Sequence, residues 1–109
     1  MKPGDFGNWF DALHHMEKEI DKHDYDICII GCGAYGFLQA AHCKRSGKKA
    51  IHLGGATQLL FGIKGKRWED PTYGFNGTSY SSFMTPYWVR PSIEETPQQS
   101  EAIEGGCYW

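Results

Sequence analysis

The sequence predicts an α/β fold, and three observations support this class. An amphipathic helical pattern comes first, two short apolar runs each end at glycines, and a second helical pattern lies between those runs. Short apolar runs that stop at glycine are typical of buried parallel strands. A strand, a glycine turn, a helix and a second strand form a βαβ unit, for which a right-handed crossover is the rule. We therefore expect a Rossmann-like βαβ unit behind an N-terminal amphipathic helix, followed by an irregular aromatic C-terminal region.

The first element is a helix that begins after Asn8. Apolar residues recur every three to four positions, from Trp9 or Phe10 through Leu13 and Met16 to Ile20, which is the spacing of one helix face. Asn is among the residue types that cap helix N-termini. The pattern predicts a helix that packs its apolar face on the rest of the fold.

The βαβ unit is predicted from the residues that follow. The run from Ile27 to Ile30 is apolar and β-branched throughout, so we expect a strand buried on both faces. Small and large apolar residues at helical spacing predict a helix over residues 34–46, with Gly47 as its left-handed C-cap. A second strand is predicted over residues 49–53, and a short helix over residues 56–61.

The remaining chain has little regular pattern. Residues 69–86 are rich in Gly, Ser, Thr, Tyr and Asn and are expected to form an aromatic loop, ordered or disordered. Residues 87–90 predict a short edge strand, and Ser92 could begin a helix that Pro97 breaks early. The aromatic end, Tyr108 and Trp109, is expected to be tucked against the body.

This pattern predicts two parts, a nucleotide-binding half-domain over residues 1–68 and an aromatic extension over residues 69–109 packed on it. Two parallel strands are few for an open sheet, because doubly wound domains carry about five or six. We therefore expect the chain to be a fragment of a larger domain whose N-terminal half supplies further strands.

Composition limits the class of protein. The chain has 109 residues, 40% of them hydrophobic and 15% aromatic, as in globular domains. No apolar run is long enough to span a bilayer and no secretory signal begins the chain, so a soluble, cytoplasmic protein is expected. The spacing of the four cysteines resembles neither a disulfide scaffold nor a zinc site, which predicts reduced thiols.

Charge is divided along the chain. None of the 13 acidic residues lies between Ile27 and Trp68, whereas this stretch holds most of the basic ones, namely Lys44, Arg45, Lys48, Lys49, Lys64, Lys66 and Arg67. A basic, glycine-rich centre predicts a site for a small anionic ligand, most simply a phosphate. The acidic flanks argue against nucleic acid, whose long phosphate backbone they would repel.

A glycine pattern lies at the end of the first predicted strand. Gly31, Gly33 and Gly36 form G-x-G-x-x-G between a strand and a helix, the context in which this pattern indicates phosphate binding. Gly31 permits the sharp turn, Gly33 lets a phosphate approach the backbone, and Gly36 lets helix and strand pack closely. The alternative is that all three glycines serve packing alone.

The second strand modifies this prediction. A site for NAD carries an acid near the end of that strand to bind the ribose, and here the position holds His52. NAD and S-adenosylmethionine are therefore disfavoured, and NADP less so. A ligand held by its diphosphate fits better, gripped by Lys64, Lys66 or Arg67, with Trp68 or a tyrosine stacked on its base or sugar. A solvated basic loop is the alternative.

The candidate ligand-binding residues are the two glycine clusters with their neighbours and the basic loop, namely Gly31, Gly33, Gly36, His52, Gly54, Gly55, Thr57, Lys64, Lys66, Arg67 and Trp68. No catalytic residue and no metal-binding group is assigned. His14 and His15 are adjacent on a helix, so they point to different faces and cannot chelate one metal together. His52 is the one histidine expected to lie in the ligand crevice.

The residues from Ile27 to Gly55, with their glycine turn, helix and strand ending in two glycines, resemble the C-terminal half of the GT-D-type glycosyltransferase domain, over about residues 8–68. The resemblance implies a UDP-sugar-like donor and a glycan or glycosylated acceptor. It also implies a metal-associated acidic motif, with its divalent metal, in the N-terminal half of that domain. This chain has no counterpart, because Asp24-Tyr25-Asp26 enters a strand rather than leaving one, so catalysis by this chain alone is not expected.

Two other functions stay open. One is an NADP-dependent or other nucleotide-binding oxidoreductase, which the same fold would support. The other is a non-enzymatic module that docks a protein or carbohydrate through exposed aromatic residues, namely Trp68, Tyr73, Phe75, Trp88 and Trp109. The donor base, the acceptor and any homo-oligomer are not determined by the sequence.

Overall fold

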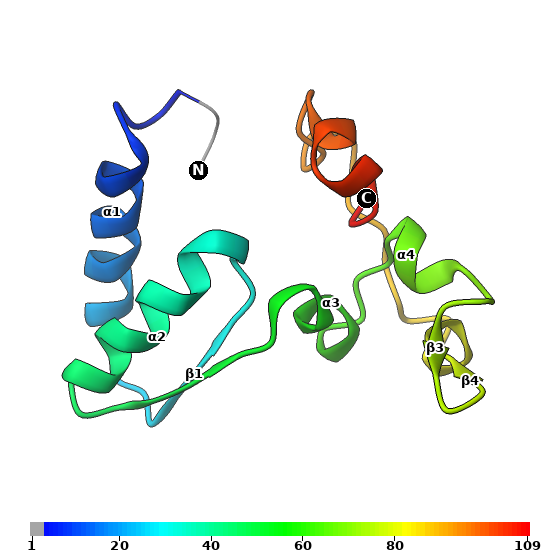
Figure 1. The fold of residues 1–109 in the computed structure, drawn as a ribbon, viewed down its shortest axis with the longest axis horizontal. Helices are drawn as coiled ribbons and strands as arrows, with labels where there is room; N and C mark the ends of the chain where they lie inside the picture. The colour runs from blue at the N-terminus through cyan, green and yellow to red at the C-terminus, as the bar shows by residue number, and fades with distance from the viewer. Residues whose placement is uncertain (1–3) are drawn as a thin grey trace. The chain divides into compact units, whose positions relative to one another are not determined.

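The computed structural model describes residues 4–109, which have a mixed α/β structure (Figure 1). The chain divides into two compact units, unit 1 up to Gly54 and unit 2 from Gly55. This boundary lies earlier in the chain than the predicted one at Trp68. The regular elements of unit 1 are α1 (Trp9–Asp21), β1 (Ile27–Ile30), α2 (Gly36–Arg45) and β2 (Lys49–His52). Those of unit 2 are α3 (Thr57–Leu60), α4 (Lys66–Glu69), β3 (Gly74–Phe75) and β4 (Thr78–Ser79). None of the helices in residues 4–109 has the length and apolar character needed to cross a membrane.

Helix α1 begins as predicted. The Asn8 backbone is extended, and its side-chain oxygen accepts a hydrogen bond from the Asp11 amide at 3.0 Å, which satisfies a donor that the first helical turn leaves unpaired. Ala12 and Leu13 are buried, whereas Phe10 is 63% exposed. Trp9 stacks on Tyr35 with ring centroids 4.6 Å apart, so the start of α1 contacts the segment that leads into α2.

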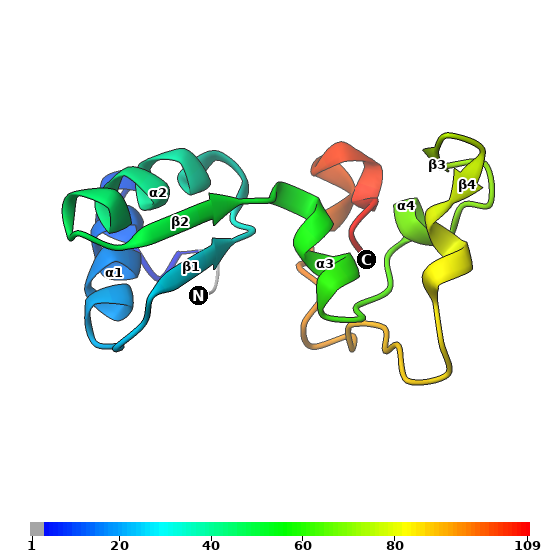
Figure 2. The ribbon, with the colours of Figure 1, turned by 90° about the horizontal axis from the view of Figure 1, so that it is seen from below.

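The predicted βαβ connection is present in unit 1. Strands β1 and β2 pair in parallel (Figure 2). Ile30 is opposite His52, and the Leu53 amide extends the ladder to the Ile30 carbonyl at 3.0 Å. A 3₁₀ turn over Gly33–Tyr35 precedes α2, so the predicted helix starts as a tighter turn. Gly47 has φ +78° just after α2, as expected for a left-handed C-cap.

The prediction that the first strand is buried on both faces is wrong. Ile30 is 5% exposed, but Ile29 on the other face is 46% exposed and its partner Ile51 is 48% exposed. Successive side chains of a strand point to opposite faces. Both helices of unit 1 lie on the same side of the strand pair (Figures 1 and 2), so only the face that bears Ile30 is covered within the unit.

Unit 2 is organised around Trp68, which is 4% exposed. The Trp68 indole contacts the rings of Tyr73 and Tyr80, and its N–H donates to the Gln58 carboxamide oxygen at 2.7 Å. A buried indole usually finds such a partner. Trp68 therefore forms the core of this unit, and it is not an exposed ring on which a base or sugar could stack.

The segment predicted to lack regular structure contains a short antiparallel hairpin. Strands β3 and β4 pair through Phe75 and Thr78, and between them Asn76 and Gly77 have φ of +49° and +76°. Asn-Gly is the preferred sequence for a two-residue hairpin turn with positive φ at both positions. The sequence contained this signal, but the glycine and serine content around it favoured a loop.

The C-terminal residues pack on the body of unit 2, as predicted. The Tyr108 carbonyl accepts from the Gln58 side chain at 2.8 Å, and the Trp109 carbonyl accepts from the Lys66 amide at 3.2 Å. A Cβ on the buried Gly65 would lie 2.8 Å from the Tyr108 carbonyl oxygen, so only glycine permits this approach.

The edge strand and the helix predicted for the C-terminal region are only partly formed. The predicted edge strand contributes one parallel bridge, between Val89 and Ile63. Ser92 and Glu95 exchange backbone-to-side-chain hydrogen bonds as in a capping box, but no α-helix follows before Pro97.

Candidate ligand-binding site

The glycine turn of unit 1 lies at the carboxyl edge of the parallel strand pair. Because Ile30 is opposite His52, the residues that follow each strand leave the same edge. Gly33 has φ +53° and Gly54 has φ +57°, and no atom lies within 4 Å of a Cβ built on either residue. Both positions favour glycine and leave open space beside the backbone, where a ligand can approach closely.

Gly36 has a different role from Gly33. A Cβ on Gly36 would lie 2.3 Å from Cε1 and 2.4 Å from Nε2 of His52, so the imidazole ring occupies the space that a side chain would need. Close packing between helix and strand is the role expected for the third glycine of the pattern. In this protein a histidine of β2 provides that packing.

His52 also links the ends of the two strands. Its Nδ1 lies 3.3 Å from the Ile30 carbonyl oxygen and 3.3 Å from the Gly54 amide nitrogen. A ring protonated on Nδ1 donates to the carbonyl, and the other neutral tautomer accepts from the amide. The ring therefore orders the edge where a ribose-binding carboxylate would lie in a site for NAD.

The basic residues predicted to grip phosphate belong to unit 2, and two of them are paired with acids. Lys66 Nζ lies 2.8 Å from Glu101 Oε1, and Arg67 pairs with Glu104. The Arg67 guanidinium also donates to the Tyr108 hydroxyl at 3.1 Å and lies 4.8 Å from the centre of that ring. These contacts attach the C-terminal segment to α4.

The pairing of Arg67 with Glu104 affects both groups. The Glu104 carboxylate raises the pKa of Arg67, and the Arg67 guanidinium lowers the pKa of Glu104. Each charged form is stabilised by its partner. A phosphate that bound Arg67 would therefore have to compete with this carboxylate.

The other predicted residues of unit 2 have structural contacts. A Cβ on Gly55 would lie 2.5 Å from Cε1 of Tyr108, Thr57 is the first residue of α3, and the Lys64 amide donates to the Val89 carbonyl at 2.7 Å. The structure brings five of the predicted residues together in unit 1, namely Gly31, Gly33, Gly36, His52 and Gly54. The other six lie in unit 2, namely Gly55, Thr57, Lys64, Lys66, Arg67 and Trp68.

Gln39 was not predicted as a site residue. It is 1% exposed, its carboxamide nitrogen donates to the Leu13 carbonyl at a long 3.4 Å, and its carboxamide oxygen is buried without a partner. Its position could have indicated its burial, because it lies four residues from both Tyr35 and Cys43 on the helix. Polar character alone favoured an exposed side chain.

The sulfur and imidazole groups of unit 1 form no metal centre. The four cysteines are free thiols in the structure, and within residues 4–109 no group of three or more His, Cys, Asp or Glu side chains is arranged to hold a metal ion. His42 instead joins α2 to α1, with Nε2 at 2.8 Å from Asp21 Oδ1. This contact matches a packing role for His42.

Comparison with protein-family models, curated proteins and solved structures finds no match to this chain.

Proposed function

We propose that the chain is the nucleotide-binding part of a Rossmann-like glycosyltransferase domain, and that the turn between β1 and α2 binds the diphosphate of a nucleotide-sugar. The observation that carries this proposal is the geometry of Gly33, a left-handed glycine at the carboxyl edge of a parallel strand pair with open space beside it. Ligands of parallel α/β folds bind at this edge.

Backbone groups would be the main phosphate ligands. The first amides of a helix have no intrahelical partner and carry a partial positive charge, and the 3₁₀ turn and α2 both start within the glycine pattern. Lys49 begins β2 opposite Ile27, at the far end of the strands, so it does not supply charge to the turn. Recognition by backbone N–H groups is common for diphosphates.

We further propose that the nucleotide-sugar is a UDP-sugar and that the acceptor is a glycan, as the resemblance to the GT-D type implies. A site for NAD has a carboxylate at the position that His52 occupies here. This difference favours a ligand that is held by its diphosphate and disfavours NAD. An oxidoreductase that uses NADP is the competing function, and binding measurements with both ligands separate the two.

Two glycine variants test the proposal. Gly33→Ala and Gly47→Ala introduce the same methyl group at positive φ, with no atom within 4 Å in either case, so both carry a similar backbone strain of roughly 1–2 kcal/mol. Only Gly33 lies at the proposed site. The melting temperature is measured with UDP, a UDP-sugar, inorganic diphosphate or NADP.

We expect UDP and the UDP-sugar to stabilise the wild-type chain, by about 2.7 kcal/mol when present at 100 times the dissociation constant. Gly47→Ala should keep this shift and Gly33→Ala should lose it. Equal shifts in the two variants would contradict binding at the turn, and stabilisation by NADP alone would favour the oxidoreductase. Lys66→Ala with Arg67→Ala is a poorer test, because both side chains attach the C-terminal segment.

A binding module is a second candidate, favoured by the exposure of aromatic rings in unit 2. Phe75 is 71% exposed and Tyr73 is 42% exposed, and exposed aromatic side chains suit protein or carbohydrate contacts. Binding of a glycan in the absence of any nucleotide, abolished by Phe75→Ala, would support this candidate.

A further inference from the structure

A cavity of unit 1 lies beside the glycine turn. It has a volume of about 370 Å³. Its lining includes Met16 and Ile20 of α1, Ile30 at the end of β1, and Gly31 and Cys32 of the turn. Gln39 of α2 also lines it. Because Gly31 and Cys32 belong to both the cavity and the turn, one ligand could occupy both places.

Gln39 gives this cavity a specific chemical requirement. Its side chain is almost fully buried, and its carboxamide oxygen has no hydrogen-bond partner in the structure. A buried acceptor left unpaired costs on the order of 1–3 kcal/mol. The oxygen has almost no accessible surface, so a ligand in the cavity reaches it only by shifting the carboxamide. A ligand that then brought an N–H donor to this oxygen would remove the cost.

The other lining groups favour a neutral and largely apolar ligand. Met16, Ile20 and Ile30 provide apolar surface. Burial raises the pKa of the Cys32 thiol, and burial together with the neighbouring Cys43 raises that of the Cys28 thiol to about 11, so both line the cavity as neutral groups. His15 and Glu19 of α1 complete its polar lining. Apolar walls with few polar groups are typical of small-molecule sites.

We propose that this cavity receives the base of the nucleotide whose diphosphate binds the glycine turn, with a base N–H donating to Gln39 Oε1. A nucleobase is a neutral, planar heterocycle with N–H donors at its edge, and it combines the apolar surface and the donor that the cavity requires. The inference rests on the proposed function for its diphosphate, but the base contact can be measured separately.

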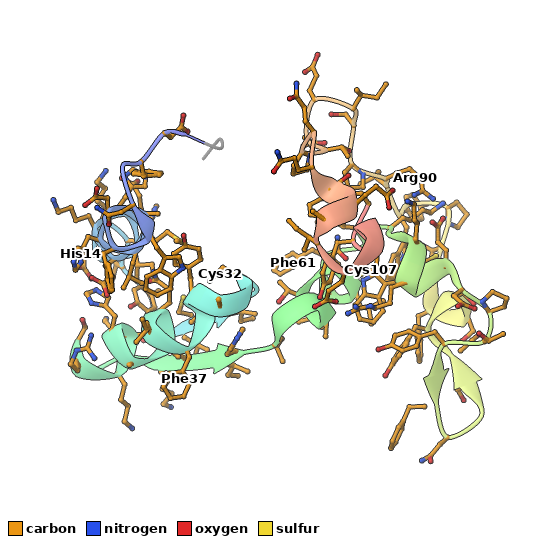
Figure 3. All side chains as sticks on the ribbon, turned by 45° about the horizontal axis from the view of Figure 1, so that its top comes forward. His14, Cys32, Phe37, Phe61, Arg90 and Cys107 are labelled. Atoms are coloured by element: carbon orange, nitrogen blue, oxygen red, sulfur yellow. The ribbon has the colours of Figure 1, made fainter. Side chains whose placement is uncertain are left out.

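The experiment measures binding of uridine, UDP and inorganic diphosphate to the full chain by calorimetry. Gln39→Leu removes the acceptor at similar volume and should not impair folding, since the carboxamide has an unpaired buried oxygen and loses only one long hydrogen bond, to the Leu13 carbonyl. Met16→Phe fills the cavity without changing Gln39. His14→Phe is the control, because His14 lies on the side of α1 away from Cys32 and does not line this cavity (Figure 3).

The wild-type chain should bind UDP about tenfold or more tightly than inorganic diphosphate, a difference of about 1.4 kcal/mol. Gln39→Leu and Met16→Phe should lose this preference and keep the affinity for inorganic diphosphate, whereas His14→Phe should keep both. On addition of uridine, the side-chain amide resonances of Gln39 should shift.

Either of two results would overturn the base site. One is equal affinity for UDP and inorganic diphosphate in the wild type, and the other is a preference for UDP that survives in Gln39→Leu. Failure of the proposed function looks different, because inorganic diphosphate would then not bind, while uridine would still bind and shift the Gln39 resonances.

Discussion

Gly33 and Gly36 lie three positions apart in one pattern, yet different physical constraints require them. Gly33 has a positive φ and open space around it, whereas Gly36 has an ordinary helical φ of −59° and no room for a side chain. At Gly33 the backbone conformation excludes larger residues, and at Gly36 the His52 ring excludes them. The sequence predicted the packing role of Gly36, but neither its partner nor the positive φ of Gly33.

The contact between Gly36 and His52 predicts a change of sign in a double-mutant cycle. In the wild type, Gly36→Ala places Cβ 2.3 Å from the imidazole, and we expect a loss of about 1–3 kcal/mol in unfolding free energy. In a His52→Ala background the same change should stabilise α2 by up to about 1 kcal/mol, because Ala is a better helix former than Gly. Urea unfolding of the four proteins measures both effects, and additive changes would show that the ring does not limit this position.

Glu104 predicts an acid-dependent stability of unit 2. The Arg67 guanidinium lowers the pKa of Glu104 in the folded chain, so the folded state binds this proton less readily than the unfolded state does. The resulting stability is present above the unfolded pKa, about 4.3 for Glu, and is lost as the pH falls through the lower folded pKa.

Glu104→Gln should therefore lower stability at neutral pH and flatten the acid limb of a plot of melting temperature against pH. Glu94→Gln is the matched control, because Glu94 makes no ion pair within residues 4–109. An acid limb that stays as steep in Glu104→Gln as in the control would contradict the prediction.

At the scale of elements, β1 shows what a sequence pattern leaves open. The run from Ile27 to Ile30 predicted a strand, and the strand has these bounds. The continuous apolar run also predicted burial on both faces, but α1 and α2 cover only one. A short apolar run that ends at glycine identifies a strand, whereas burial depends on what packs on each face.

Adjacent residues of β1 should therefore differ in their contribution to stability. Ile30→Ala removes a buried side chain and should cost about 2–5 kcal/mol. Ile29→Ala removes one that is 46% exposed and should cost less than about 1 kcal/mol. Chemical denaturation of the two variants measures the difference, and similar losses would mean that the face with Ile29 and Ile51 is covered in solution.

The hairpin and the C-terminal segment differ in how far their structure can be predicted from the sequence. The turn at Asn76-Gly77 was readable from its sequence, whereas the contact of Gly65 with Tyr108 joins residues far apart in the chain. Contacts of this kind have no local signal. The unpaired carboxamide oxygen of Gln39 likewise has no local signal, because it results from the packing of α2 against α1.

At the scale of the whole molecule, each unit has buried residues of its own. Leu13, Ile30 and Cys43 are buried in unit 1, and Trp68 is buried in unit 2. The two predicted phosphate-binding segments, the glycine turn and the basic loop, belong to different units. The basic loop interacts with acids of its own unit, which is why the proposed function relies on the turn.

Separate cores predict that the two units open independently. Ile30→Ala should speed hydrogen exchange at the amides of α1, β1, α2 and β2 and leave the amides of α4 unchanged. Trp68→Ala should have the reciprocal effect. Mass spectrometry of exchanged peptides distinguishes the units, and faster exchange across the whole chain in both variants would instead indicate one cooperative unit.

The sequence by itself determined the elements of unit 1, the cap at Asn8 and the glycine turn, because helix patterns, short apolar runs, capping residues and turn glycines are local properties. Only the tertiary structure decided which face of β1 is covered, that His52 fills the space beside Gly36, that Trp68 is a core residue, and that Lys66 and Arg67 pair with Glu101 and Glu104. Each of these depends on contacts between distant residues, and such contacts form only when the chain is folded.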